Sequence, residues 1–476
     1  MLAACGDDRA HHRSLVLSEC RLLKVPQAAQ CGTLQVPENR AQPAGRKLDI
    51  FVAVLPANTL SPKDDPLVIV AGGPGQAAST LGPFAALLSA VRRTRDIVLI
   101  DQRGTGRSSP LTCKAFKPEW RPDFDTDLDP LPKAKACLDE LKSAGVDPAQ
   151  YTTSAWVADL EAVRVALGYP RLNLWGGSYG TRVVLEYFRR HPERVRTVIL
   201  DGVVAPSMKI TLDVWTTRDA AFSEIIAACK ASTACFAAHP DPVATLAEIE
   251  RDLGPAGKRI AVVDPRSGDK LEVSMSYDLV LAAMQPLLYL PEGASLIPEL
   301  LSRALAGDYA PLVAASLIIT GDRSEQLNAA LHYSVTCAED VPRITPEARR
   351  EVLSSVRTHD LAQRVLAVCD IWPRGTMPSD FAEPVKSDIP VLILSGGLDP
   401  VTPPRYGAEV AKSLPNSKHI VAAGYGHVVS PHACAPRLIA AFIDDAGFAK
   451  LPNSCLAYFA TSTRPPFFTS LLEASP

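Results

Sequence analysis

The sequence predicts an α/β fold in which a mostly parallel sheet carries helices on both of its faces. Short runs rich in valine, isoleucine and leucine alternate with stretches whose apolar residues recur every three or four positions. The expected strands are residues 48–55, 66–71, 96–101, 172–176, 197–201, 390–395 and 419–423. Between them, residues 155–167 and 181–190 have the spacing of helices that pack on a sheet. Strands that alternate with helices in this way define the α/β class.

The alternation of strands and helices stops between residues 201 and 390. This stretch instead shows helical patterns, which cover residues 220–230, 243–252, 277–288 and 346–356. The last pattern has a typical helix start, because Thr345 can cap the helix and Pro346 suits its first position. The expected divisions are a tail at residues 1–18, a core at residues 19–205 and 385–476, and an inserted, mainly helical lid at residues 206–384.

The overall charge of the chain excludes one large class of partners. The 49 lysines and arginines nearly balance the 52 aspartates and glutamates, which leaves a formal net charge of −3. A chain without an excess of positive charge has no long-range field that attracts nucleic acid, so we expect no nucleic-acid partner.

The first residues resemble the end of a bacterial lipoprotein signal. In the run Met1-Leu2-Ala3-Ala4-Cys5, Cys5 stands where a lipobox has its lipid-bearing cysteine. Membrane attachment through a lipid on Cys5 is therefore one expectation, and an ordinary N-terminal tail is the alternative. No other segment approaches the roughly 18 apolar residues that cross a bilayer.

Apart from Cys5, ten of the 11 cysteines fall along the chain as near neighbours. The neighbours are Cys20 and Cys31, Cys113 and Cys137, Cys229 and Cys235, Cys337 and Cys369, and Cys434 and Cys455. Disulfides between neighbours are the simplest arrangement, and buried free thiols are the alternative. There is no Cys-x-x-Cys and no histidine at zinc-ligand spacing, so we expect no metal site. Disulfides indicate an oxidising compartment and hence an exported protein.

The strongest chemical motif is Gly176-Gly177-Ser178-Tyr179-Gly180. It follows an expected strand and precedes an expected helix, which is the context of a nucleophile elbow that presents a serine hydroxyl at a sharp turn. Because this hydroxyl is a weak nucleophile, it needs a nearby base. His427 is the preferred base, since it lies in a glycine-rich loop after the final strand. His419 at a strand start and His432 beyond a proline are the alternatives.

The base in turn needs an acid, and the reaction needs donors for an oxyanion. Asp399, just past an expected strand, is the preferred acid that would orient His427, and Asp201 at another strand end is the alternative. The Gly-Gly-Pro-Gly turn at residues 72–75 follows a strand, so its Gly73 amide is expected to form an oxyanion hole with the amide of Tyr179. An ordinary glycine-proline turn is the alternative.

Three motifs in order carry a family resemblance: the Gly-Gly-Pro-Gly turn at 72–75, Asp-Gln-Arg-Gly-Thr-Gly-Arg-Ser at 101–108, and the elbow at 176–180. Together they resemble the proline iminopeptidases among the α/β-hydrolases, and more closely the longer secreted branch of bacterial tripeptidyl aminopeptidases. The resemblance spans nearly the whole chain. It departs at Ala71, where the family often has histidine. It implies that the 101–108 loop is structural, with Arg103 paired to a carboxylate.

The resemblance implies an exported aminopeptidase that acts on peptides with a free N-terminus through an acyl-enzyme on Ser178, without a cofactor or metal. It also implies acidic groups on the lid for the substrate ammonium, which Glu339 and Asp340 would supply, although adjacent acids are commonly just solvated. An esterase or other small-molecule hydrolase with the same residues is one alternative, since the fold does not choose between amide and ester. A non-catalytic binding protein is the other.

Overall fold

The computed structural model describes residues 14–116, 129–324, 327–357 and 359–470, so Cys5 and its expected lipid lie outside the described residues. The centre of the molecule is a sheet with strand order β1-β2-β3-β5-β4-β6-β7-β10-β11. The strands are β1 (Ser18–Arg21), β2 (Ala28–Pro37), β3 (Lys47–Leu55), β4 (Leu67–Val70), β5 (Ile97–Ile100), β6 (Leu172–Gly177), β7 (Val195–Asp201), β10 (Val391–Gly396) and β11 (Ser417–Ala422). Every strand expected from the sequence is present, and the α/β prediction is confirmed.

The sheet is parallel from β5 to β11 and antiparallel at its other edge. Neighbouring strands among β5, β4, β6, β7, β10 and β11 are parallel. Strand β3 pairs with β5 in antiparallel orientation, and β2 and β1 follow in the same way toward the edge. Strands β1 and β2 were not expected from the sequence. Strand β2 lies near the edge and buries only part of its residues, so it lacks the continuous apolar run that marks the central strands.

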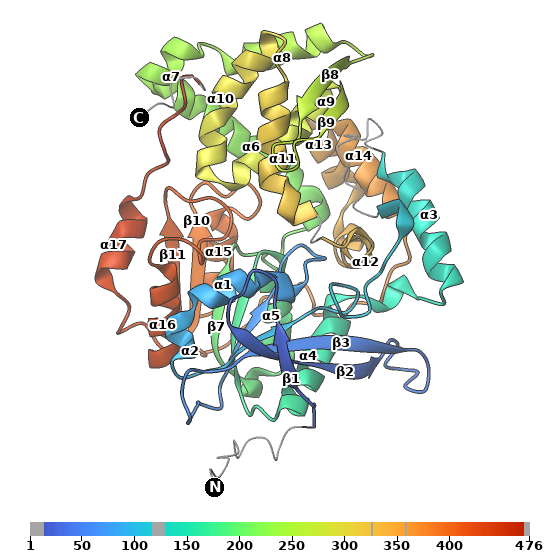
Figure 1. The fold of residues 1–476 in the computed structure, drawn as a ribbon, viewed down its shortest axis with the longest axis vertical. Helices are drawn as coiled ribbons and strands as arrows, with labels where there is room; N and C mark the ends of the chain where they lie inside the picture. The colour runs from blue at the N-terminus through green and yellow to red at the C-terminus, as the bar shows by residue number, and fades with distance from the viewer. Residues whose placement is uncertain (1–13, 117–128, 325–326, 358, 471–476) are drawn as a thin grey trace.

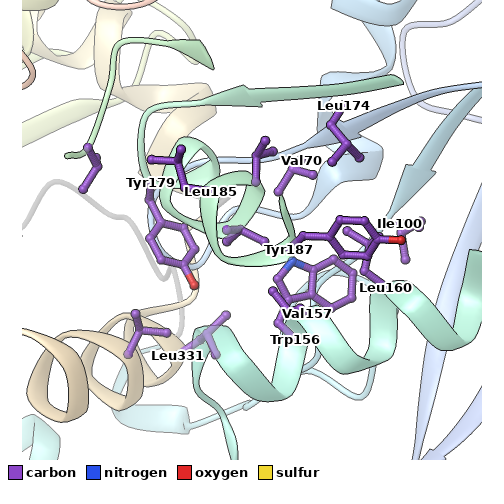
Figure 2. Close-up of a cluster of buried hydrophobic side chains, with 14 of the residues drawn as sticks. Val70, Ile100, Trp156, Val157, Leu160, Leu174, Tyr179, Leu185, Tyr187 and Leu331 are labelled. Carbon is purple, nitrogen blue, oxygen red and sulfur yellow. The ribbon is translucent and has the colours of Figure 1, made fainter. Parts of the chain in front are cut away.

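Helices cover both faces of the sheet. One face is covered by α3 (Pro130–Ser143), α4 (Thr153–Leu167), α5 (Tyr179–Arg190) and α15 (Pro404–Ala411), and the other by α1 (Gly82–Leu87), α2 (Ser89–Arg92), α16 (Ala435–Asp445) and α17 (Asn453–Thr461). Val68 and Val70 of β4 enter the first core cluster, whereas Leu67 and Ile69 enter the second. Figure 2 shows the first cluster, where Trp156 and other side chains of the covering helices pack against the strands.

A long inserted segment lies between β7 and β10, on one side of the sheet (Figure 1). It contains α6 (Ile210–Ala231), α7 (Thr233–Ala238), α8 (Pro242–Leu253), β8 (Lys258–Val263), β9 (Lys270–Met275), α9 (Tyr277–Met284), the 3₁₀ turn η6 (Pro286–Tyr289), α10 (Pro291–Leu305), α11 (Ala310–Ser324), α12 (Ala329–Glu339), the 3₁₀ turn η7 (Val341–Arg343), α13 (Pro346–Ser355) and α14 (His359–Val368). The segment is mainly helical, as expected. It also contains the antiparallel hairpin β8–β9, which was not expected from the sequence. Within the described residues no single helix is both long and apolar enough to span a membrane, and one pair passes that test only with a 91° bend between its helices.

The inserted segment contributes to three hydrophobic clusters, the smallest of which contains Trp215, Val356 and Ala362. Its larger part, from Phe222 to Leu317, forms a cluster of its own. Helix α12 does not join it, because Leu331, Val335 and Cys337 belong to the core cluster on the α4 and α5 face of the sheet. Helix α12 therefore packs with the core, although it lies within the range 206–384 that we expected to form the lid.

All five neighbour pairs of cysteines form disulfides. The bonds join Cys20 to Cys31, Cys113 to Cys137, Cys229 to Cys235, Cys337 to Cys369, and Cys434 to Cys455. The pairing predicted from the sequence is confirmed, and the disulfides indicate an exported protein. The Cys337–Cys369 bond ties the end of α12 to the residue that follows α14.

Arg103 has the carboxylate partner that the resemblance implied. Its guanidinium contacts both oxygens of Asp159, at 2.6 and 2.7 Å, and donates to the carbonyls of Glu38 and Gln150. Both side chains of the Arg103–Asp159 pair are completely buried. Arg40 contacts the same carboxylate, with 2.6 Å between nitrogen and oxygen. Arg40 lies at the surface, and 39% of its side chain is exposed.

The two arginines offer a matched test of this ion pair. We expect Arg103→Met to lower the free energy of unfolding by about 3–5 kcal/mol, because it leaves a buried carboxylate without its main partner. Arg40→Met should cost less than about 1 kcal/mol, as is usual for an exposed pair. Urea unfolding followed by tryptophan fluorescence measures both. Equal losses in the two variants would contradict the assignment of Arg103 as the main partner.

Candidate active site

A sharp turn joins β6 to α5 at Ser178. The strand ends at Gly177, the helix begins at Tyr179, and Ser178 between them has φ 55° and ψ −127°. A positive φ of this kind is rare for a residue with a side chain, so the backbone is strained at this turn. A Cβ on Gly180 would lie 2.4 Å from the Val70 carbonyl oxygen, so the turn also needs glycine where the helix meets β4. The motif thus has the geometry of the predicted elbow.

Backbone hydrogen bonds hold the turn on both sides. The Ser178 amide donates to the carbonyl of Asp201 at the end of β7, over 2.9 Å. The Ser178 carbonyl accepts from the amide and hydroxyl of Thr181, at 2.9 and 2.6 Å. A Cβ on Gly72 would come within 3.1 Å of the Ser178 Cβ, so the loop after β4 passes directly beside the serine. We propose Ser178 as the nucleophile on this geometry.

The preferred base and acid are hydrogen-bonded to each other. The Nδ1 atom of His427, in the loop after β11, lies 2.8 and 3.0 Å from the two carboxylate oxygens of Asp399, in the loop after β10. Asp399 also accepts from the amides of Val401 and Thr402, at 2.8 Å each. Burial opposes ionisation of Asp399, but His427 and these donors outweigh it, so the pKa of Asp399 lies below its ordinary value. An ionised Asp399 is suited to orient the imidazole and to stabilise its protonated form.

The alternative acid, Asp201, performs a different task in the structure. Its carboxylate accepts from the amides of Val429 and Ser430, at 2.9 and 2.6 Å, and thereby fixes the chain just after His427. Burial raises the pKa of Asp201 to about 6. Val428, next to His427, has φ 68°, so the loop is also held in a left-handed conformation at this point. We interpret Asp201 as a support of the histidine loop.

The alternative bases lie elsewhere. The Nε2 atom of His419, on β11, is 3.0 Å from the Ser395 hydroxyl, and the ring of His432 packs against Tyr425. A residue of the inserted segment, Tyr289, contacts both the backbone and the ring of His427. The His427 amide donates to the carbonyl of Tyr289 over 3.1 Å, and the Tyr289 ring stands edge-on to the imidazole at 5.3 Å.

The two proposed oxyanion donors come from neighbouring parallel strands. Gly73 follows β4 and Tyr179 follows β6, and these strands pair so that Val70 lies opposite Gly176. Gly73 has φ 106°, a conformation open to glycine. Tyr179 is the first residue of α5, where amides lack an intrahelical acceptor and the helix dipole favours negative charge. In the described part of the chain, neither amide donates to a backbone carbonyl.

Glu339 and Asp340, the expected ligands of a substrate ammonium, lie buried at the end of α12. Glu339 accepts from the Thr153 amide at 2.7 Å and from its hydroxyl at 2.9 Å, and faces Arg182 at 3.4 Å. Asp340 pairs with Arg182 at 2.9 Å and with Arg343 at 3.1 Å. Burial raises the pKa of Glu339 to about 7 although Arg182 opposes this. Their role toward substrate stays a prediction.

Three further residues, which were not expected from the sequence, contact the candidate site. Thr402, whose hydroxyl donates to Asp399 at 2.8 Å, follows it by three residues, and an Asx-type turn could have suggested the contact. Tyr289 and Thr153 approach the site from distant parts of the chain, and no local pattern marks either of them.

Known proteins agree with this architecture. The family model described as alpha/beta hydrolase fold matches residues 65–235, and the model described as TAP-like protein matches residues 354–455. The serine protease Hip1 of Mycobacterium tuberculosis is 26% identical over 83% of this chain and 81% of its own length. The tripeptidyl aminopeptidase of Streptomyces coelicolor is 30% identical over 43% of this chain and 41% of its own length. The proline iminopeptidase of Xylella fastidiosa is 31% identical over 30% of this chain and 34% of its own length.

The sheet order, the elbow and the first family model define a hydrolase of the α/β class. With a TAP-like C-terminal part and these relatives, the chain is similar to the proline iminopeptidases and tripeptidyl aminopeptidases. The resemblance that the three motifs indicated is confirmed.

Asparagine variants separate the two candidate acids. We expect Asp399→Asn to lower kcat by about 10³–10⁴-fold, because the amide cannot stabilise the imidazolium form of His427. Asp201→Asn keeps one acceptor oxygen for the histidine loop and should cost only about tenfold in kcat. Both are measured with a short-chain ester on protein whose thermal unfolding is cooperative. An equal loss in a folded Asp201→Asn variant would make Asp201 the catalytic acid.

The raised pKa of Glu339 predicts a pH-dependent stability. Its pKa rises from an ordinary 4.5 to about 7 on folding, so the neutral form contributes stability below about pH 4.5 that is lost as the pH rises through 7. Relative to Glu339→Gln, the wild type should therefore become less stable over this range. Urea unfolding of both proteins at several pH values measures the difference, in which the titration of Asp201 and other shared groups cancels. A constant difference would contradict the shift.

Proposed function

We propose that this protein is an exported serine peptidase that removes residues or tripeptides from the free N-terminus of peptides. The observation that carries the proposal is the hydrogen-bonded pair of His427 and Asp399. The two residues follow the paired strands β11 and β10, which belong to the same sheet as β6, the strand that leads into the Ser178 elbow. The names of the relatives, which include a serine protease and two kinds of aminopeptidase, support peptide substrates. Attachment to a membrane by a lipid on Cys5 is part of the proposal.

The geometry supports acyl transfer in two steps. The Ser178 hydroxyl attacks the scissile carbonyl carbon while Nε2 of His427 takes its proton, and Asp399 stabilises the resulting imidazolium. The negative charge moves to the carbonyl oxygen, toward the amides of Gly73 and Tyr179. When the C–N bond breaks, His427 gives its proton to the leaving nitrogen, and the shortened peptide departs as an amine.

Water completes the cycle. His427 takes a proton from water, which attacks the Ser178 ester through a second oxyanion, and the proton returns to the Ser178 oxygen as the ester bond breaks. The products are the released N-terminal fragment, with a new carboxylate, and the free enzyme. All proton transfers use His427.

A substrate panel tests the proposal. Aminoacyl and tripeptidyl arylamides with a free amine should be cleaved, the same compounds with an acetylated amine should not, and a fluorophosphonate should label Ser178. Ser178→Ala should lose at least about 10⁴-fold in kcat and all labelling. Cleavage of short-chain esters without cleavage of any free-amine arylamide would favour an esterase. Lack of labelling in the wild type would favour the non-catalytic alternative.

A further inference from the structure

Helix α12 lies against both parts of the proposed oxyanion hole. It belongs to the core cluster, and Figure 2 shows Leu331 of this helix next to the ring of Tyr179. The Cys337–Cys369 disulfide and a hydrogen bond from Trp372 to the Ser334 hydroxyl, 3.1 Å long, fasten the helix to the segment that follows α14. The helix is therefore anchored independently of the site it touches.

The N-terminal end of α12 holds the loop that carries Gly73. The amide of Asn328, the cap of the helix, donates to the Gly75 carbonyl over 2.9 Å, and Leu327 forms a β-bridge with Gln76. A Cβ on Gly75 would lie 2.6 Å from the Asn328 carbonyl oxygen, so the two backbones are in close contact. The Asn328 side chain caps α12 at Leu331 and also donates to a carbonyl outside the helix.

The C-terminal end of α12 holds Tyr179 through a chain of hydrogen bonds. Glu339 accepts from the Thr153 hydroxyl at 2.9 Å, and this hydroxyl lies 2.7 Å from the phenol oxygen of Tyr179. The phenol in turn lies 3.3 Å from the donating Nε2 of Gln102. Since the Thr153 hydroxyl donates to Glu339, it accepts from Tyr179, and Tyr179 accepts from Gln102. Every donor points toward the carboxyl group.

We propose that α12 sets the oxyanion hole, with Glu339 as a positioning residue that fixes the Tyr179 amide through Thr153 while Asn328 fixes the loop of Gly73. This inference rests on the proposed function of Ser178 and its oxyanion donors. It explains why a residue of the inserted segment is buried behind the nucleophile. It assigns Glu339 an action on the enzyme itself and gives it no contact with substrate.

The physical basis is the stiffness of a buried, fully bonded phenol. Tyr179 is completely buried, so its hydroxyl must keep both partners or lose a hydrogen bond without access to water. Because Tyr179 is the first residue of α5, its amide has no intrahelical acceptor, and the anchored ring holds the Cα from which this amide is presented. An oxyanion donor stabilises the transition state only when it is already aimed at the developing charge.

The relay is the chain of hydrogen bonds from Gln102 through Tyr179 and Thr153 to Glu339. The test uses two variants that interrupt this relay and two controls, all in the full-length protein. Glu339→Gln and Thr153→Val interrupt the relay, whereas Thr153→Ser keeps a hydroxyl at this position and serves as a control. Glu186→Gln is the matched control, because Glu186 is a buried carboxylate on α5 that pairs with Arg189 and Arg190 outside the relay. Turnover is expressed per site titrated with a fluorophosphonate, so that misfolded protein does not count.

We expect both relay variants to lower kcat about 10- to 100-fold with KM unchanged, which is less than the loss expected when a donor is removed outright. The loss should be equal on a short-chain ester and on a free-amine arylamide. Affinity for a peptide boronate, whose tetrahedral adduct occupies the oxyanion hole, should fall by the same factor. The double variant should lose no more than either single one, since both interrupt one path. Thr153→Ser and Glu186→Gln should retain wild-type turnover.

Two results would overturn the proposal. A loss confined to free-amine substrates in Glu339→Gln would make Glu339 a ligand of the substrate ammonium. Unchanged turnover of titrated sites in both relay variants would show that the relay does not position Tyr179. Failure of the proposed function is a separate result, because it appears in Ser178→Ala and in the substrate panel. The relay can still be measured with the ester if no peptide is cleaved.

Discussion

The backbone of Ser178 is held at a positive φ, which costs a serine of order 1–3 kcal/mol and persists only when its surroundings impose it. Its amide is bonded to Asp201 on β7 and its carbonyl to Thr181 on α5. The carboxylate of the same Asp201 binds the chain just beyond His427. One strand end therefore holds both the nucleophile turn and the histidine loop. This shared support links Ser178 and His427, about half the chain apart, through one buried residue.

A buried charge cluster supports the elbow from behind. Arg182, in the first turns of α5, faces both Glu339 and Asp340, and Arg343 adds a second cation. Removing charges from water is costly, and such a cluster is tolerated only when its polar atoms find partners. Here Arg182 and Arg343 also donate to the Met208 carbonyl. The hydrogen bonds that satisfy these charges also determine how α12 lies against α5, so the stability of the core and the geometry of the site depend on the same contacts.

The sequence was informative wherever function depends on a local pattern. Ser178, Asp399 and His427 could be singled out as candidates because each follows a strand and lies in a short glycine-rich or motif-bearing loop. The antiparallel strands β1 and β2 were missed because an edge strand leaves polar residues exposed and lacks a continuous apolar run. The surroundings of Glu339 were out of reach for another reason. Its partner Thr153 lies 186 residues away, and no property of either residue alone indicates the contact.

The inserted segment touches the site through two parts that differ in packing. Tyr289, next to the hydrophobic cluster formed by the larger part of the insertion, binds the His427 amide. Helix α12 packs in the core cluster and contacts the loop of Gly73 and, through Thr153, Tyr179. A displacement of the larger part would thus pull on the histidine loop, whereas α12 is retained by the core and by the Cys337–Cys369 bond. The larger part of the insertion is therefore packed separately from the helix that contacts the proposed oxyanion donors, Gly73 and Tyr179.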